Sequence, residues 1–161
     1  MRYTANGPQG YYFEEIEVGE VQVTQGRTIT EADVVNFGNV TGDFNPLHFD
    51  AEFMKSSMFG ERLAHGMLVM SFGVGLVNQL GTGLGTVLAF KGLTIDFRRP
   101  VLIGDTIRVR TTVTEKREAS NRPGGWVMQN FEILNQRDEV VQEGSWGVLF
   151  AFKPKEDTEQ N

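Results

Sequence analysis

The fold and the candidate site both depend on two short segments, GDFNPLHFD at residues 42–50 and AHGM at residues 64–67. The proline of the first segment fixes its own φ and disfavours the helical region for the residue before it, so the chain must turn there. A turn can bring Asp43 and His48 toward a common point, whereas a continuous helix would point residues five apart in different directions. Acid–base catalysis needs two proton-carrying groups facing one pocket, so we predict Asp43 and His48 as catalytic residues.

The second segment leads into the most apolar run of the chain, MLVMSFGVGLV at residues 67–77. A helix that is apolar on every side is typical of a buried position, so this run predicts a central helix enclosed by other structure. Small residues at 71, 73 and 75 offer places where strands could approach it closely. The first N–H groups of a helix are free and its dipole is positive there, and Gly66 lacks a Cβ that would block a ligand oxygen from reaching one of them.

The segment before the first motif predicts a strand and then a helix. Val21 to Ile29 is rich in β-branched residues, which favours a strand. Thr30 and Asp33 have the spacing of a capping box, so a helix should begin at Glu31 and lead directly into the Asp43 turn. A second, short helix is expected within residues 50–57.

Beyond the central helix, the glycine-rich residues 81–85 predict a flexible break, and the rest of the chain alternates with period two. Turn signals at Pro100, Gly104-Asp105 and residues 123–125 separate the strands. The positions that share one face of the strands are apolar except for Thr111, and they are Leu93, Ile95, Phe97, Ile107, Val109, Thr111, Val113, Trp146, Val148, Phe150 and Phe152. Helix first and an antiparallel meander afterwards is an α+β order, in which one apolar sheet face can wrap the central helix.

Length and composition narrow the class of protein. The 161 residues, 40% of them hydrophobic, predict one globular domain with its own core. A formal net charge of -6 argues against binding to nucleic acid. The chain contains no cysteine, which excludes disulfides and thiol catalysis.

Neither end of the chain indicates targeting. Residues 1–10 are polar and lack the apolar core of a secretory signal, so we expect a flexible N-terminal segment and a cytoplasmic location. The apolar run at 67–80 is shorter than the roughly 20 residues that cross a bilayer, which predicts no membrane contact. Residues 154–161 are charged and polar, as in a frayed tail.

Three segments together resemble a known signature: Gly42 to His48, Phe59-Gly60 and Leu63 to Met67 are similar to the motif of the MaoC-like dehydratases, the (R)-specific enoyl-CoA hydratase family with the hot-dog fold. The resemblance extends from about Phe13 to Phe152 when the sheet landmarks at residues 97–101 and 104–106 are included. It implies a single hot-dog domain over residues 1–161, with a core at about 13–153. Two positions depart from the family pattern: Met54 replaces a small residue, and Val74 replaces a serine near the substrate in some relatives.

The resemblance also implies an activity. The reaction would be reversible addition of water to a 2-enoyl-CoA thioester, giving the (R)-3-hydroxyacyl thioester. Asp43 and His48 would hold the water, and the Gly66 N–H would stabilise the enolate oxygen. Together with Gly66, Asn45 and His65 are expected to bind the substrate or its oxyanion. Asn45 would hold the turn, and His65 would either line the pocket or make a structural hydrogen bond at the helix start. Coenzyme A would enter as part of the substrate with no separate cofactor, an acyl carrier protein is an alternative donor, and the expected assembly is a homodimer or larger homo-oligomer.

Several alternatives stay open at this point. Asp43, His48 and Asp50 are potential metal ligands, but no second histidine follows at helical spacing, so no metal is expected. Arg98 and Arg99 suit either coenzyme A phosphates or a solvated strand end. The bulky residues Phe59, Met67, Met70 and Phe72 would either shorten an acyl pocket or belong to the core. A hot-dog acyl-CoA thioesterase and a non-catalytic acyl-thioester-binding subunit, which the missing hydroxyl at Val74 would suit, are the competing functions.

Overall fold

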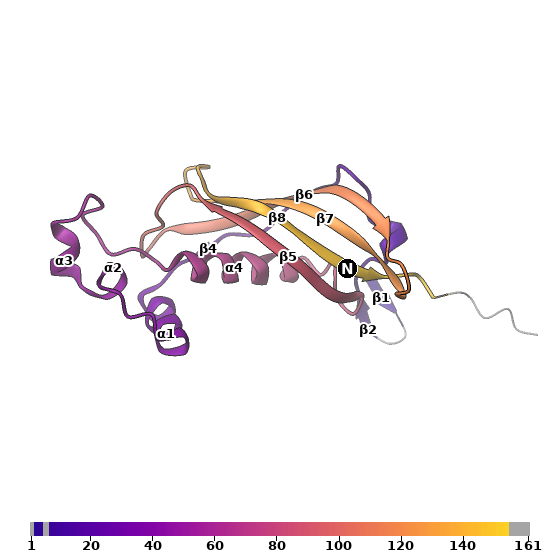
Figure 1. Cartoon of the computed structure of the whole chain (residues 1–161), viewed down its shortest axis with the longest axis horizontal. Coiled ribbons are helices and arrows are strands. Elements are labelled where there is room, and N and C mark those ends of the chain that lie inside the picture. Colours follow the sequence, from indigo (N-terminus) through magenta and orange to yellow (C-terminus); the bar gives the residue numbers. More distant parts are fainter. Residues whose placement is uncertain (1, 5–6, 155–161) are drawn as a thin grey trace, which may run out of the picture.

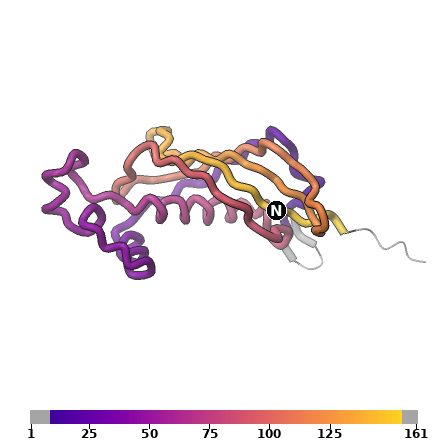
Figure 2. The backbone as a smooth tube through the Cα atoms, in the orientation of Figure 1, coloured from indigo at the N-terminus to yellow at the C-terminus, as the bar shows by residue number. Residues whose placement is uncertain are grey.

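The computed structural model describes residues 2–4 and 7–154, and these form an antiparallel sheet wrapped along one long helix (Figures 1 and 2). The main sheet has the strand order β3-β6-β7-β8-β5, and β4 pairs with β6 beside β3. In chain order the elements are β1 (Arg2–Thr4), β2 (Gly7–Gln9), the 3-10 helix η1 (Phe13–Glu15), β3 (Val21–Val23), β4 (Arg27–Thr28), α1 (Glu31–Thr41), α2 (Pro46–Phe49), α3 (Ala51–Lys55), α4 (Gly66–Gln79), β5 (Val87–Phe97), β6 (Thr106–Glu118), β7 (Gly124–Leu134) and β8 (Val140–Ala151). The helices precede the long strands, which confirms the predicted α+β class.

The core lies between α4 and the inner face of the sheet. Strands β6 and β7 alternate buried and partly exposed residues along most of their length, as expected for a sheet with one covered face. Gly73 lets α4 approach that face, because a Cβ there would lie only 2.8 Å from Ile133 Cδ1. The residues buried to less than 2% exposure include Val34, Val69, Ile107, Val109, Val127, Phe131 and Ile133. A single layer of sheet therefore covers one side of the helix.

The central helix is buried against the sheet, as predicted, but it is not enclosed on all sides. Met67, Ser71 and Gly75 form an exposed stripe along α4, although the helix is apolar around its whole circumference. Of the three small residues predicted to meet strands, Gly73 alone does so: a Cβ on Gly75 would contact nothing within 4 Å, and the Ser71 hydroxyl donates to the Met67 carbonyl. In a single chain the sheet therefore covers only one side of α4.

The capping box predicted the start of α1 correctly. The Thr30 hydroxyl accepts a hydrogen bond from the Asp33 N–H, and the Asp33 carboxylate accepts one from the Thr30 N–H. Helix α3 lies within the expected short helix at residues 50–57, with the Asp50 carboxylate accepting from the Phe53 N–H. Both helices therefore begin where a side chain satisfies a backbone donor.

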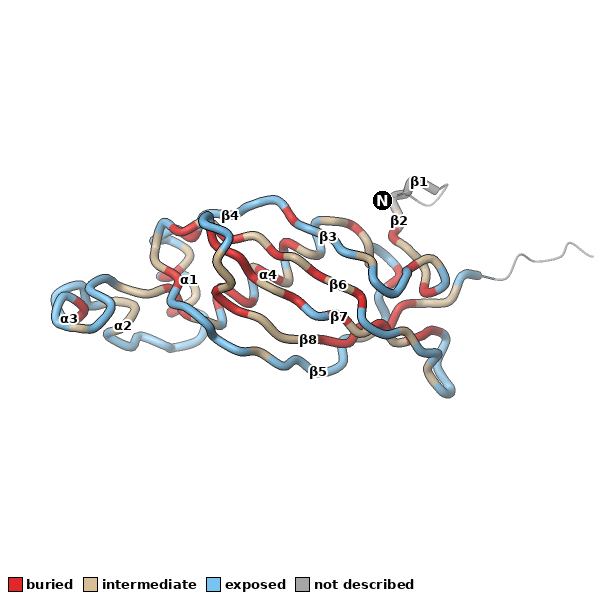
Figure 3. The backbone as a smooth tube through the Cα atoms, turned by 90° about the horizontal axis from the view of Figure 1, so that it is seen from above, coloured by how far each residue is buried: buried red, intermediate tan, exposed pale blue. Residues whose placement is uncertain are grey.

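The predicted strand from Val21 to Ile29 is wrong in its continuity, because it divides into β3 and β4. Between them, the Thr24 hydroxyl accepts the hydrogen bond of the Val109 N–H, so a side chain replaces one rung of the backbone ladder. Strand β5 also begins earlier than its alternation indicated, at Val87. It forms one edge of the sheet, as Figure 3 shows along the row of strands.

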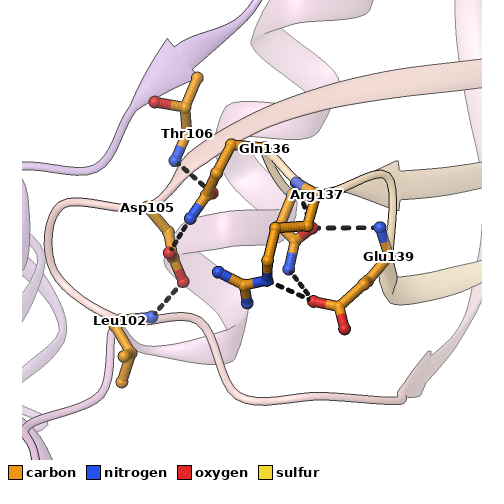
Figure 4. Close-up of polar contacts among 7 residues, drawn as sticks. Leu102, Asp105, Thr106, Gln136, Arg137 and Glu139 are labelled. Atoms are coloured by element: carbon orange, nitrogen blue, oxygen red, sulfur yellow. Dashed lines mark hydrogen bonds and ion pairs between the residues drawn. The ribbon is translucent and has the colours of Figure 1, made fainter.

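Asp105 fixes the connections at the end of the sheet near the start of α4 (Figure 4). Its carboxylate accepts from the Leu102 N–H at 2.9 Å and from Gln136 Nε2 at 2.6 Å. Gln136 in turn accepts from the Thr106 N–H, so the turn before β6 and the turn between β7 and β8 are tied together. Because Asp105 is buried, these bonds also satisfy a charge that would otherwise be costly to desolvate.

The chain ends differ in what can be described. Strands β1 and β2 pair as a small antiparallel hairpin, in a segment where the sequence predicted flexibility. The frayed tail expected at 154–161 lies outside the described residues from 155 onward. Among the described helices, none combines the length and apolar character needed to cross a membrane.

Candidate active site

The site lies where α1, α2 and α4 meet, beyond one end of the sheet (Figure 1). Helix α1 ends at Gly42 in the left-handed region (φ 77°), a conformation that glycine adopts without strain. Asn45 then caps α2 by accepting the Leu47 N–H, and Pro46 takes the first helical position. The predicted turn therefore exists, and Asn45 is engaged in holding it.

The turn brings Asp43 and His48 together. The distance from Asp43 Oδ2 to His48 Nε2 is 4.0 Å. This is too long for a direct hydrogen bond, but one water molecule can donate to both atoms at ordinary distances of about 2.8 Å. The Asp43 side chain is 51% exposed, whereas that of His48 is 12% exposed. Asp43 is thus exposed to solvent, whereas His48 is mostly buried.

The hydrogen bonds of His48 determine which ring nitrogen carries its proton. His48 Nδ1 lies 2.8 Å from the Leu63 carbonyl oxygen. A carbonyl can only accept, so Nδ1 donates and Nε2 of the neutral ring carries the lone pair. Leu63 is itself held, because its N–H donates to the Leu47 carbonyl at 3.0 Å. The basic nitrogen of His48 therefore faces the Asp43 carboxylate.

Burial lowers the pKa of His48 below its ordinary value of 6.5, and the nearby His65 ring acts in the same direction. The hydrogen bond to the Leu63 carbonyl and the charge of Asp43 oppose this decrease without reversing it. At neutral pH His48 is consequently uncharged and able to accept a proton.

This pKa shift predicts a loss of stability in mild acid. Above pH 6.5 His48 is neutral in both the folded and the unfolded chain and adds no pH dependence. As the pH falls below 6.5 the unfolded chain binds the proton first, so the free energy of unfolding decreases until the folded pKa is passed. Urea titrations of wild type and His48→Asn across this window should show a steeper decrease in wild type. Parallel curves for the two proteins would contradict the lowered pKa.

His65 lies directly behind this pair. Its Nε2 is 2.9 Å from the backbone carbonyl oxygen of Asp43, and its ring centroid is 3.8 Å from that of His48. The residue is only 2% exposed. Asp43, His48 and His65 each place one potential ligand atom within 4.8 Å of the others, whereas Asp50, the other acid considered as a ligand, caps α3. A metal ion here would compete with the water position between Asp43 and His48.

Gly66 begins α4, and its N–H makes no hydrogen bond within the described part of the chain. A Cβ on Gly66 would lie 2.5 Å from the Phe97 ring, so the strand β5 approaches the helix start closely. No sequence pattern indicated Gln142, which is buried in β8 and donates to the Gly66 carbonyl at 2.8 Å. Gln142 lies beside Gly66 because it pairs with Phe97 on the neighbouring strand β5.

Two hollows meet at His48, Gly66 and Phe97. One, of about 390 Å³, extends toward Phe59, Pro100 and the two arginines at 98 and 99. The other, of about 290 Å³, is lined by Phe37, Thr41, Asp43, His48, His65, Gly66, Met67 and Phe97. Arg98 is paired with Glu143 at 2.6 Å, whereas Arg99 makes no ion pair with any described residue. The site is therefore an apolar cavity with acid–base groups and a free helix N-terminus at its centre and a cation at its rim.

The predicted bulky residues divide between cavity and core. Phe59 lines the larger hollow and Met67 the smaller one. Met70 is buried in the core, and Phe72 is partly buried against the core, with the Arg27 guanidinium 3.5 Å from its ring centroid. Val74, one of the two departures, lines a separate apolar hollow of about 180 Å³ near the far end of α4. Met54, the other, is a fully buried residue of α3.

The chain is similar in sequence and in fold to known proteins. A 3-hydroxybutyryl-CoA dehydratase from Methylorubrum extorquens is 40% identical over 106 residues, which are 65% of this chain and 64% of that protein. The crystal structure of an R-hydratase from Pseudomonas aeruginosa matches with a TM-score of 0.76 and 32% identity, covering 90% of this chain and 88% of that one. A Mycobacterium tuberculosis protein with a double hot-dog fold matches with a TM-score of 0.75 and 24% identity, covering 94% of this chain and 47% of that one.

The chain thus spans less than two thirds of the length of its curated Methylorubrum relative. The MaoC like domain family matches residues 14–127, which contain the Asp43 turn, the whole of α4 and the first two long strands. Together with the antiparallel sheet that wraps α4, this match shows that the chain has the hot-dog fold and belongs to the MaoC-like dehydratase family.

Proposed function

We propose that this chain is an enoyl-CoA hydratase, which adds water reversibly to the C2=C3 double bond of a 2-enoyl-CoA to give the (R)-3-hydroxyacyl-CoA. The observation that carries the proposal is the 4.0 Å separation of Asp43 Oδ2 and His48 Nε2 beside the free N–H of Gly66. The resemblance to hydratases and to a 3-hydroxybutyryl-CoA dehydratase supports the thioester substrate. The (R) stereochemistry of the product rests on this resemblance alone.

The proposed chemistry needs one proton to move. A water molecule donates one hydrogen to His48 Nε2 and the other to the Asp43 carboxylate. As its oxygen bonds to C3, His48 takes the first proton and then releases it to C2, so the product gains one hydroxyl and one hydrogen. Asp43 keeps a hydrogen bond to the new hydroxyl and stabilises the imidazolium ion. Because the two groups are this close, their protonation steps belong to the pair.

Negative charge develops on the thioester oxygen between the two bond-forming events. The Gly66 N–H at the positive end of α4 is the proposed donor to that oxygen. Loss of one such donor typically raises the barrier by about 3 kcal/mol. Gln142 supports this geometry from the sheet by holding the Gly66 carbonyl. The proton transfer and the charge stabilisation thus meet at one point of the cavity.

The rim of the larger hollow suits the carrier end of the substrate. Arg99 is the proposed partner for a coenzyme A phosphate, because Arg98 is already paired with Glu143. The same arginine would also attract the acidic surface of an acyl carrier protein. No separate cofactor is required by this chemistry.

A second copy of the chain is proposed to complete the site. The edge strand β5 leaves large apolar residues exposed, including Phe90 at 52% and Phe97 at 56%, and Met67 on the adjacent stripe of α4 is 48% exposed. Phe97 lines both hollows at the site. Pairing of β5 with its copy would cover this edge, extend the sheet and close the cavity next to Gly66. We therefore propose a homodimer with sites at its interface.

The test is an assay of the purified chain with enoyl-CoA substrates of different length and branching. Loss of the enoyl-thioester absorbance, with chiral analysis giving the (R)-3-hydroxyacyl product, is the expected result. Release of free thiol from saturated acyl-CoA without hydration would show a thioesterase. Binding of every enoyl-CoA without turnover would show a non-catalytic acyl-thioester-binding subunit.

A further inference from the structure

The two histidine rings of the chain lie against each other, and that of His65 is the more deeply buried. His65 is 2% exposed, and aromatic rings surround it: Phe37 lies 5.0 Å away, Phe49 5.9 Å away and His48 3.8 Å away between ring centroids. A ring packed in this way has little room to move. The proposed chemistry uses Asp43, His48 and Gly66, and it assigns no role to His65.

His65 makes its one side-chain hydrogen bond to the main chain of Asp43. A carbonyl oxygen can only accept, so His65 Nε2 carries the proton and donates to Asp43 O at 2.9 Å. The Asp43 carboxylate itself is half exposed, and its other anchor is a long bond of 3.3 Å from the Asn45 N–H to Oδ1. The Asp43 N–H also donates to the Thr41 hydroxyl at 3.3 Å, so the buried bond from His65 is the shortest of the three that hold this exposed residue.

The second ring nitrogen of His65 distinguishes it from His48. His65 Nδ1 is buried and has no hydrogen-bond partner among the described residues. The two rings therefore hold opposite tautomers, with the proton on Nδ1 in His48 and on Nε2 in His65.

From these contacts we infer that His65 is a positioning residue, which sets both members of the acid–base pair at once: its N–H holds the Asp43 backbone, and its ring face supports the His48 imidazole. This inference rests on the proposed function for its kinetic consequences. It differs from the expectation that His65 binds substrate, because the ring lies behind His48 and makes its polar contact to the chain itself.

Two substitutions separate the two contacts. His65→Gln places an amide N–H as many bonds from the backbone as Nε2, so it keeps the donor to Asp43 and loses the ring face. His65→Phe keeps a ring against His48 and puts a C–H where the donor was, which pushes the Asp43 carbonyl away. A displacement of about 1 Å at a catalytic group can lower kcat by about 10²-fold. We expect His65→Phe to lose about that factor in kcat with KM unchanged, and His65→Gln to recover part of the loss.

Nitrogen NMR of the imidazoles tests the same inference without any turnover. The chain has only two histidines, so wild type should show one Nδ1–H ring and one Nε2–H ring at neutral pH, and His65→Phe leaves His48 alone in the spectrum. We expect the His48 signals to move or broaden in His65→Phe. If wild type shows no hydration at all, the proposed function fails while the tautomers remain measurable, so the two failures are distinguishable.

A matched control tests for general destabilisation. Val127→Ala opens a small cavity in the core. Val127 of β7 pairs with Val148 of β8, at the opposite end of these strands from Gln142. At a similar loss of Tm this variant should keep wild-type kcat and an unchanged His48 spectrum. Wild-type kcat with unchanged His48 signals in His65→Phe would overturn the inference. So would an increase of KM alone, which would indicate direct substrate contact.

Discussion

His48→Asn is expected to lower kcat for enoyl-CoA hydration by about 10² to 10⁴-fold, the usual contribution of a general acid–base residue. The asparagine amide can replace Nδ1 as donor to the Leu63 carbonyl, so the fold around the turn is retained while the basic Nε2 is lost. Asp43→Asn is expected to cause a comparable decrease, because the amide cannot stabilise an imidazolium ion. Initial rates from the enoyl-thioester absorbance measure both effects.

Asp50→Asn serves as the matched control for this pair of substitutions. Asp50 lies in the same segment and caps α3, and an asparagine side chain caps a helix about as well. Its rate should equal that of wild type. Unfolding curves of all three variants would show whether the fold is intact. If either Asp43→Asn or His48→Asn retained the wild-type rate, the acid–base assignment would be refuted.

Phe90→Lys is expected to split the proposed dimer. Burial of one Phe side chain contributes roughly 2 kcal/mol, and a two-fold symmetric interface contains the residue twice, so the dimer should weaken by about 10³-fold. Light scattering should then give 18.0 kDa, the mass of one chain, where wild type gives twice that value. Hydration activity should fall together with the dimer, because the partner is proposed to close the cavity at Phe97.

Val40→Lys is the control for this surface. Val40 is 86% exposed on α1 and lies away from the β5 edge. The same change of charge there should leave both mass and rate unaltered. A wild-type chain that is a stable monomer with full activity would remove the basis for a second copy at the site.

The sequence predicted the elements around the site well where local chemistry determines them. Thr30 and Asp33 satisfy each other's backbone donors, so the start of α1 depends on residues three apart and is readable from the chain. Pro46 likewise forces the turn between Asp43 and His48 whatever surrounds it. Interruption of the first strand was missed because it depends on a bond between Thr24 and Val109, which are far apart in sequence.

The sequence predicted a buried central helix but not which of its faces would be covered, for a related reason. Composition shows that α4 is apolar on every side, but it cannot show how many layers are available to cover it. One sheet covers the face that contains Gly73, and the stripe from Met67 to Gly75 stays exposed in a single chain. The proposed second copy of the chain would cover the exposed stripe and the open edge of β5.

By itself, the sequence determined the family, the α+β order and the two residues proposed for proton transfer, because capping, proline geometry and period-two alternation act over a few residues. Only the tertiary structure decided the protonated nitrogen of each imidazole, the neutral state of His48 and the place of Gln142 behind Gly66. Those properties arise from carbonyl groups and burial supplied by distant segments, and no pattern within one segment encodes them.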